Sequence, residues 1–414
     1  MFTETRPNIE DIIGDIRSQF PVLDQEVNGR PLIYFDNAAT NQKPHRVIGA
    51  LQDYYSKDNS NIHRGIHTLA ERATKAYEET RASVKEFINA AHKEEIIFTS
   101  GTTQGINLVA SSYGGAFLKK GDEVIISTLE HHSNIVPWQI ACEKSGAALK
   151  VIPVDDTGTL DMEAYKKLLS DKTKIVAVNH ASNSLGTINP VAEIIEMAHN
   201  YGAVVMIDGA QAVAHLDVDV QSLDADFYAF SSHKMYGPTG TGVLYGKLGL
   251  LEKMPPYQGG GEMIKEVTFE KTTFNDPPYK FEAGTPNIAD VIAMKEAIGF
   301  INDIGKGAIA EWEEDLLQYA MTRVENIAGF KPWGTAKNKV GVLSFTIDGI
   351  HHFDLGQMLD ASGVAVRTGH HCTQPLMRRF DIEGTVRASF SVYNTKEEVD
   401  YFAKSLERTV KFLK

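Results

Sequence analysis

The sequence AVVMIDGAQ (residues 203–211) and the sequence DFYAFSSHKMYGPTGTGVLYG (residues 226–246) decide the fold of this chain. Each begins as a short apolar run, of the length of a buried strand, and continues into polar or glycine-rich turn chemistry. Ligands of open α/β sheets bind beyond the carboxyl ends of the strands, so polar side chains at these ends are expected to share one site. The residues concerned are Asp208 and Gln211 after the first run, and Ser231, His233 and Lys234 after the second.

The same rhythm extends outward from this region, over about residues 31 to 250. Strand-like runs alternate with helical patterns, which is typical of βα units around a mostly parallel sheet. The strand-like runs are IIFTSG (96–101), DEVIIS (122–127) and KIVAVNHAS (174–182), and the helical patterns occupy residues 102–110, 132–145 and 192–202.

The remaining sequence predicts smaller elements at both ends. Residues 252–295 contain turn and loop chemistry around one possible strand, Glu266 to Phe269. Beyond them we expect strands in VGVLSFTIDG (340–349), VAVR (364–367) and TVRASFSV (385–392), a helix from Asp354 to Ser362, and a last helix that begins with Thr395 and Glu398 in capping-box spacing. Ile9, Ile12, Ile13, Ile16 and Phe20 lie on one helical face, so the chain opens with an amphipathic helix.

These patterns divide the chain into three parts. We expect an N-terminal helical segment, residues 1–30, packed with the small domain; a large α/β domain, residues 31–295; and a small C-terminal α+β domain, residues 296–414. A length of 414 residues agrees with two to three domains at roughly 150 residues each.

Composition excludes several classes of protein. Hydrophobic residues make up 43% and charged residues 23%, which is ordinary globular usage. The 54 acidic residues outnumber the 41 basic ones, and the resulting charge of −13 argues against nucleic acid as a partner. The N-terminus lacks an apolar signal region and no apolar run is long enough to span a bilayer, so we expect a cytoplasmic protein without membrane attachment.

The two cysteines, Cys142 and Cys372, must be judged separately. They lie 230 positions apart without CxxC spacing, so neither a disulfide framework nor a metal site is predicted. Cys142 lies in a helical pattern behind Trp138 and Ile140, which favours core packing. Cys372 lies in a loop beside His370 and His371, where neighbouring groups can favour a thiolate.

The polar residues at the strand ends fit the needs of a pyridoxal phosphate enzyme. That cofactor needs an amine for a Schiff base, a carboxylate for its ring nitrogen and donors for its phosphate. Lys234 and Asp208 supply the first two, and Gly101, Thr102 and Thr103 lie between a strand and a helix, where amides can hold a phosphate. Taken singly, a strand-end aspartate more often caps a helix, and a lysine in such a turn more often faces solvent.

Taken together, ten motifs make the chain resemble the class V aminotransferase group of fold-type I pyridoxal phosphate enzymes, and within it the group II, SufS-type cysteine desulfurases. The resemblance covers nearly the whole chain and implies a large domain with a mostly parallel sheet plus a smaller α+β domain. The motifs are YFDNAAT (34–40), NIHRGIHTLA (61–70), TSGTTQGIN (99–107), LEHHSNIVPWQ (129–139), SNSLGTINP (182–190), IDGAQ (207–211), SSHKMYGPTGTGVLYG (231–246), YQGGGEMI (257–264), FEAGTPN (281–287) and RTGHHCTQP (367–375).

The resemblance implies roles for individual residues around pyridoxal phosphate. Lys234 would form the Schiff base, Asp208 would pair with the ring nitrogen, Gln211 would touch the ring hydroxyl, and His131 would stack on the ring and carry protons. The other cofactor contacts implied are Thr102, Thr103, Asn183, Ser231 and His233, with Thr285 reaching the phosphate from the second subunit of a homodimer.

The resemblance also implies the reaction. L-cysteine would become L-alanine while its sulfur moves onto Cys372 as a persulfide, with Arg387, Arg367 and Asn183 binding the substrate. A planar guanidinium suits a carboxylate because it binds in a bidentate manner. The persulfide would then pass to an acceptor protein of SufE or SufU type, for iron–sulfur cluster assembly.

Other interpretations stay open at this stage. Selenocysteine lyase activity is expected as a side activity, another class V reaction would have no use for Cys372, and an inert scaffold would not need Lys234. The sequence leaves the identity of the acceptor open. It also leaves open whether His351 or His352 takes part in a zinc-ligand swap with that acceptor or is an ordinary surface residue.

Overall fold

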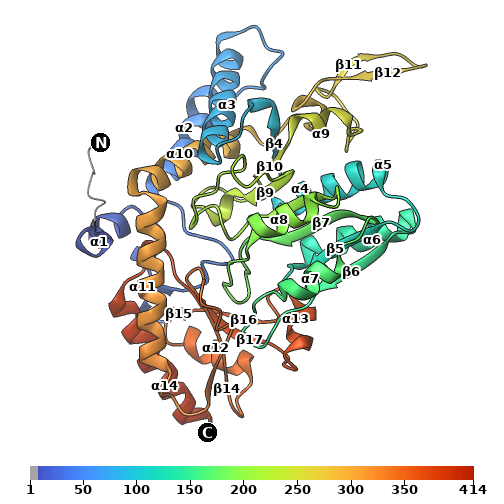
Figure 1. Cartoon of the computed structure of the whole chain (residues 1–414). Helices are drawn as coiled ribbons and strands as arrows, with labels where there is room; N and C mark the ends of the chain where they lie inside the picture. The colour runs from blue at the N-terminus through green and yellow to red at the C-terminus, as the bar shows by residue number, and fades with distance from the viewer. Residues whose placement is uncertain (1–7) are drawn as a thin grey trace, which may run out of the picture.

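A seven-stranded sheet forms the centre of the large domain (Figure 1). The structure is a computed structural model and describes residues 8–414; residues 1–7 of the expected N-terminal segment lie outside the described residues. The strand order is β4-β10-β9-β8-β7-β5-β6, and only β10 runs antiparallel to its neighbours, so the prediction of a mostly parallel sheet is confirmed. The strands are β4 (Ile96–Thr99), β5 (Glu123–Ser127), β6 (Ala148–Ile152), β7 (Thr173–Asn179), β8 (Val204–Asp208), β9 (Phe227–Ser231) and β10 (Gly242–Gly246).

All the strands except the partly exposed edge strand β6 bury both faces against helices. Successive residues of a strand point to opposite faces, and here neighbours such as Ile96 and Ile97 belong to two different hydrophobic cores. One face packs on α4 (Thr102–Leu108) and α6 (Val136–Ser145), where Cys142 is buried as expected. The other face packs among α3 (Thr68–Phe87), α8 (Val191–His199) and α10 (Ile288–Ile304); α2 (His45–Asp53), α5 (Gly115–Phe117), α7 (Met162–Leu168) and α9 (Leu248–Lys253) complete the domain.

The C-terminal part of the chain combines a four-stranded antiparallel sheet with helices, and its strand β13 is one that the sequence pattern did not predict. The strand order is β13-β14-β17-β16, and α14 begins at a capping box in which Thr395 and Glu398 cap each other. Its elements are α11 (Lys306–Val324), β13 (Phe330–Trp333), β14 (Val342–Ile347), α12 (His352–Asp360), β15 (Val364–Ala365), β16 (Arg367–Gly369), α13 (Gln374–Arg379), β17 (Thr385–Ser389) and α14 (Lys396–Leu413).

The expected single strand VAVR is wrong in one respect. Its residues divide between β15, which pairs with β3 (Ile33–Tyr34) in a two-stranded parallel sheet, and β16, which pairs with β17. Through the pairing of β15 with β3, the segment that begins the expected large domain contacts the small domain. Such a pairing between distant segments leaves no local signal in the sequence.

The expected strand Glu266 to Phe269 is also corrected. The structure has a hairpin, β11 (Ile264–Val267) and β12 (Thr272–Phe274), that projects from the body of the molecule (Figure 1). The backbone N–H of Thr268 donates to the carbonyl of Lys271 and closes the turn, so Phe269 lies at the tip.

The N-terminal helix α1 (Ile9–Arg17) ends before Phe20, earlier than its apolar face predicts. Arg17 forms an ion pair of 2.8 Å with Glu398 of α14, which places the helix against the C-terminal part of the chain. The expected domain boundary at residue 295 lies inside α10, and the division into domains stays a prediction. Within residues 8–414, no helix has both the length and the apolar character that crossing a membrane requires.

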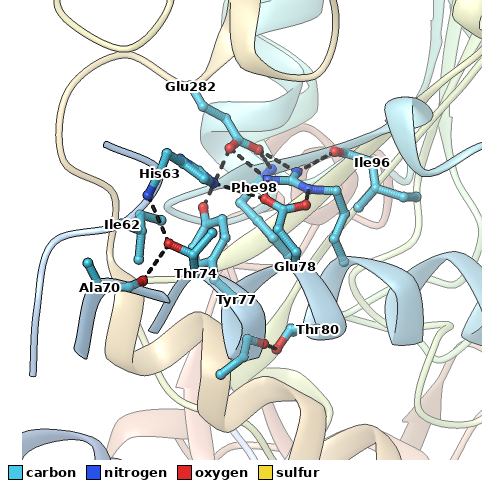
Figure 2. Close-up of polar contacts among 12 residues, drawn as sticks. Ile62, His63, Ala70, Thr74, Tyr77, Glu78, Thr80, Ile96, Phe98 and Glu282 are labelled. Atoms are coloured by element: carbon cyan, nitrogen blue, oxygen red, sulfur yellow. Dashed lines mark hydrogen bonds and ion pairs between the residues drawn. The ribbon is translucent and has the colours of Figure 1, made fainter. Parts of the chain in front are cut away.

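A buried charge cluster ties α3 to the loop that carries the FEAGTPN motif (Figure 2). Arg81 is 1% exposed and donates to both carboxylate oxygens of Glu282, over 2.7 and 3.0 Å. The guanidinium lies 4.5 Å from the ring centre of Phe98 and also donates to Glu78. The loop before α10 is therefore held to the sheet and to α3 at one buried point.

Candidate active site

One cavity of about 390 Å³ lies where the strand ends of the large domain meet the small domain. Its volume is in the range of small-ligand sites. A larger cavity, of about 730 Å³ among α3, α10 and α11, contains none of the predicted site residues. The smaller cavity is lined by all but one of the residues to which the resemblance gives a role in cofactor binding, substrate binding or catalysis: Thr102, Thr103, His131, Asn183, Asp208, Gln211, Ser231, His233, Lys234, Arg367, Cys372 and Arg387.

The exception is Thr285, which lies outside this cavity. Its side chain is exposed on the loop after η7 (Tyr279–Phe281). An exposed residue beyond its own cavity is available to a second subunit. The assignment of Thr285 to a partner's site stays a prediction.

An amine and a carboxylate line the cavity at the ends of two neighbouring strands. Asp208 is the last residue of β8, and Lys234 ends the short turn η6 (Ser232–Lys234) that follows β9. Burial lowers the pKa of Lys234 to about 8, against the opposing effect of the Asp208 carboxylate. Burial raises the pKa of Asp208, although the N–H of Ala210, 2.9 Å away, and Lys234 both favour its charged form.

Hydroxyl groups gather beside this pair. The Ser231 Oγ accepts a hydrogen bond from the backbone N–H of Thr102 at 2.8 Å and lies 2.7 Å from the Thr102 hydroxyl. Gly101 makes the approach possible, because its φ of +143° strains other residues and a Cβ there would lie 3.2 Å from that oxygen. Burial and the neighbouring Lys234 lower the pKa of His233 to about 4, so this imidazole is neutral near pH 7.

His131 is a neutral ring with an assigned tautomer. Burial lowers its pKa to about 4, and Lys234 adds to the effect. Its Nδ1 lies 3.1 Å from the backbone N–H of Ser133, which can only donate, so Nδ1 accepts and the ring proton is on Nε2. A neutral imidazole with a free N–H can stack on a ring and pass a proton.

Two arginines from adjacent strands line the small-domain side of the cavity. Arg387 is 2% exposed and donates to the carbonyl of Asn183 at 2.7 Å, while its buried Nε has no hydrogen-bond partner within residues 8–414. Asp36 accepts from Arg387 at 3.1 Å and from Arg367 at 3.3 Å. A cationic pair with an unused donor suits a carboxylate ligand.

Cys372 lies on a short loop, residues 370–373, between β16 and α13. His371 and Cys372 both have positive φ, of 50° and 59°, in the region that non-glycine residues rarely adopt. Several hydrogen bonds hold the loop, and two of them reach its carbonyl groups: Asn183 donates to the His371 carbonyl at 2.8 Å, and the backbone N–H of His132 donates to the Cys372 carbonyl at 2.8 Å. The half-buried thiol therefore belongs to the wall of the cavity.

Sequence reasoning missed some residues of this wall, among them Ser133, Asn179 and Thr239. Asn179 ends β7 as Asp208 ends β8, so the rule for strand ends could have identified it. Thr239 lies in the glycine-rich turn of the motif SSHKMYGPTGTGVLYG (231–246). Asp36 belongs to the motif YFDNAAT, but nothing local indicates that it contacts two arginines.

The residues present fit pyridoxal phosphate. A buried amine that titrates near pH 8, a buried carboxylate, a neutral imidazole and a group of hydroxyls all line one cavity. They are the amine, carboxylate and donor classes that this cofactor requires. Lys234, Asp208, His131 and the Ser231–Thr102 pair are the residues that would hold it.

The comparison with known families identifies the class of protein. The model of the family described as aminotransferase class-V matches residues 33–402. The chain therefore belongs to the class-V aminotransferase family, and pyridoxal phosphate is the cofactor that this family and the site indicate.

Named relatives narrow the group. The chain is 53% identical over 398 residues to a probable cysteine desulfurase of Halalkalibacterium halodurans, covering 96% of this chain and 98% of the relative. It is 53% identical over 396 residues to a cysteine desulfurase of Synechococcus elongatus, covering 96% of this chain and 63% of that longer protein. The apo structure of a cysteine desulfurase from Thermococcus onnurineus superimposes with a TM-score of 0.92 at 39% identity, covering all of both chains. Within its family, the chain groups with the cysteine desulfurases.

Proposed function

We propose that this protein is a cysteine desulfurase that converts L-cysteine to L-alanine and takes the sulfur onto Cys372. The observation that carries the proposal is the single cavity that joins Lys234 and Asp208 of the large domain to Arg387 and Cys372 of the small domain. A transaminase needs the first three residues. Only sulfur transfer gives a purpose to the thiol beside them.

Each residue has a task in this reaction. Pyridoxal phosphate, when bound, supplies an electron sink that allows the substrate Cα proton to leave. Arg387 and Arg367 bind the substrate carboxylate, and Asp208 holds a proton on the ring nitrogen. Lys234, whose pKa is about 8, is partly neutral at physiological pH and can take the Cα proton. His131 passes protons through its Nε2.

The sulfur step belongs to Cys372. Its thiolate attacks the substrate Sγ, a new S–S bond forms, and the substrate Cβ–Sγ bond breaks. The electron pair of the broken bond remains with the carbon fragment, which is protonated to give alanine. Cys372 ends as a persulfide, and no external oxidant or reductant is needed because the sulfur atom moves as S⁰.

The geometry of the Cys372 loop supports delivery to an acceptor that comes to the enzyme. The loop has four residues between two elements and is held at two carbonyls, so its reach is short. We therefore assign the chain to the group II, SufS-type desulfurases, with an acceptor of SufE or SufU type and a role in iron–sulfur cluster assembly. A cytoplasmic location accords with a thiol that must remain reduced.

We propose a homodimer for the same site. Thr285 is exposed and outside its own cavity, and a second subunit would bring it to the phosphate. The buried Arg81–Glu282 pair fixes the base of the loop that presents it.

The test is to treat the yellow holoenzyme with L-cysteine and to measure released alanine together with the mass of each cysteine-containing peptide. We expect one added sulfur atom on the Cys372 peptide. In Cys372→Ser the hydroxyl stays protonated near neutral pH, so the persulfide disappears and alanine release collapses while the yellow colour remains. Cleavage of selenocysteine should partly survive, because selenium leaves more easily.

Cys142→Ser is the matched control, because Cys142 is buried in α6 away from the cavity. It should form the persulfide like the parent protein. If Cys372→Ser releases alanine from cysteine as fast as the parent, the desulfurase mechanism is wrong.

A further inference from the structure

Asp36 is placed by the backbone at the junction of the two domains. It follows β3 and forms an isolated parallel bridge with Ser389, the last residue of β17. The flanking residues are bonded to the same strand end, since the N–H of Ser389 donates to the Phe35 carbonyl at 2.7 Å and Asn37 donates to the Ser389 carbonyl at 2.6 Å. The Asp36 carboxylate is therefore presented to β17 by a rigid segment.

The Asp36 carboxylate lies beside two arginines whose positive charges repel each other. Arg367 and Arg387 are register partners on β16 and β17, so two cations lie directly opposite each other. Like charges in that position destabilise a sheet. Asp36 places one oxygen on each, at 3.3 Å from Arg367 and 3.1 Å from Arg387.

The two arginines depend on Asp36 to different degrees. Arg387 is 2% exposed and keeps a second contact, the Asn183 carbonyl. Arg367 is 50% exposed, and Asp36 provides its one ion pair within residues 8–414. Without that contact, repulsion from Arg387 and hydration would favour a conformation of Arg367 in solvent.

We propose that Asp36 is a positioning residue for substrate recognition, which holds Arg367 against Arg387 so that both guanidinium groups face the substrate carboxylate. The inference rests on the proposed function, in which these arginines bind that carboxylate. The three charges sum to +1, so one bound monocarboxylate leaves the cluster neutral. The Nε of Arg387 has no hydrogen-bond partner within residues 8–414.

The test is Asp36→Asn in the holoenzyme, with ligand binding followed by the change in the visible absorption spectrum. The probes are L-alanine, which carries the carboxylate, and L-alaninol, in which a hydroxymethyl group replaces it. We expect the Kd for L-alanine to rise about tenfold, the size of one lost charge-assisted contact, while the Kd for L-alaninol stays unchanged. The KM for L-cysteine should rise and kcat should stay close to that of the parent.

Asp156→Asn is the matched control. Asp156 is 94% exposed and pairs with Arg379 at 2.9 Å, so the variant removes an aspartate–arginine pair away from the cavity. It should leave both Kd values unchanged. Should Asp36→Asn fold poorly, Arg367→Ala removes the positioned partner at a half-exposed site and should produce the same selective loss of L-alanine binding.

Three outcomes overturn the inference: an unchanged Kd for L-alanine in Asp36→Asn, an equal loss for both probes, or an unchanged L-alanine Kd in Arg367→Ala. Arg387→Lys separates this inference from the proposed function. If Arg387→Lys weakens L-alanine but Asp36→Asn does not, only the role of Asp36 fails. If Arg387→Lys has no effect either, the assignment of the arginines to the substrate fails.

Discussion

Burial gives Lys234 the acid–base behaviour that an amine nucleophile needs. Its pKa is lowered to about 8, so near neutral pH a useful fraction carries a free electron pair. Below pH 8 the neutral fraction falls about tenfold for each pH unit. An exposed lysine would reach the same fraction only about two pH units higher.

The lowered pKa of Lys234 predicts the pH dependence of the reaction between the apoenzyme and pyridoxal phosphate. When the adduct is trapped with borohydride at short times between about pH 6 and pH 10, the rate should rise with pH and reach half its maximum near pH 8. In Asp208→Asn the midpoint should move lower, because the lost carboxylate favoured the ammonium form. Lys234→Ala should form no trapped adduct. A midpoint above about pH 10 would contradict the assignment of a buried nucleophile.

At the scale of elements, the Arg81–Glu282 pair joins α3 to the loop before α10 (Figure 2). Arg81 donates further to the Ile96 carbonyl at 2.7 Å, and Glu282 accepts from the Phe98 N–H at 2.8 Å, so β4 is part of the same cluster. A buried cation that loses its carboxylate partner retains its desolvation cost. The pair is therefore more sensitive to removal of one member than a surface ion pair is.

We predict that Glu282→Gln lowers the free energy of unfolding by about 3 kcal/mol or more, measured by chemical denaturation. Glu79→Gln is the control, because Glu79 pairs with Lys295 on the surface, and it should change the value by less than about 0.5 kcal/mol. If both variants lowered the free energy of unfolding equally, the buried pair would contribute no more to stability than the surface pair.

The lowered pKa of the neighbouring Glu78 predicts that the protein loses stability in acid. Burial alone would raise its pKa, but hydrogen bonds and charge from His63 and Arg81 lower it to about 2. A carboxylate whose pKa is lowered by folding stabilises the fold above its unfolded pKa, about 4.3, and loses that contribution as the pH falls toward 2. In Glu78→Gln the stability measured from about pH 5 to pH 2 should fall less steeply than in the parent. An identical slope in both proteins would refute this contribution.

At the scale of the whole molecule, the proposed dimer predicts complementation between two defective subunits. Thr285→Ala should weaken cofactor binding about tenfold or more, through loss of a hydrogen bond to a charged phosphate. In a hybrid of one Thr285→Ala subunit with one Lys234→Ala subunit, one site has its own Lys234 and receives Thr285 from the partner. That site should bind pyridoxal phosphate with the affinity of the parent and produce alanine.

The hybrid can be purified with two different affinity tags, and its cofactor content can be measured after dilution. If Thr285 acted on its own cavity, no site of the hybrid would be intact and neither affinity nor activity would return. Sedimentation of the parent as a fully active monomer would also contradict the proposal.

The sequence by itself determined most of the elements and predicted most of the residues that line the cavity, because their signals are local. Short apolar runs that end in Asp208 and Ser231 are buried strands of a parallel sheet, and the residues after them reach the edge where ligands bind. The capping box at Thr395 and Glu398 defines the start of α14 through contacts within four residues. The proposed roles of the individual site residues came from the resemblance of ten ordered motifs to a known family, because residue type and spacing alone left those roles open.

Only the tertiary structure decided features that depend on pairing between distant segments. The division of VAVR between two sheets, the turn at Phe269 and the contact of Asp36 with two arginines each depend on backbone placed far away in the chain. The register of β16 on β17 sets Arg367 opposite Arg387, and a shift of one residue would turn one of them to the other face. Register and burial are properties of the packed chain, because loop closure and desolvation act between residues that are not neighbours in sequence.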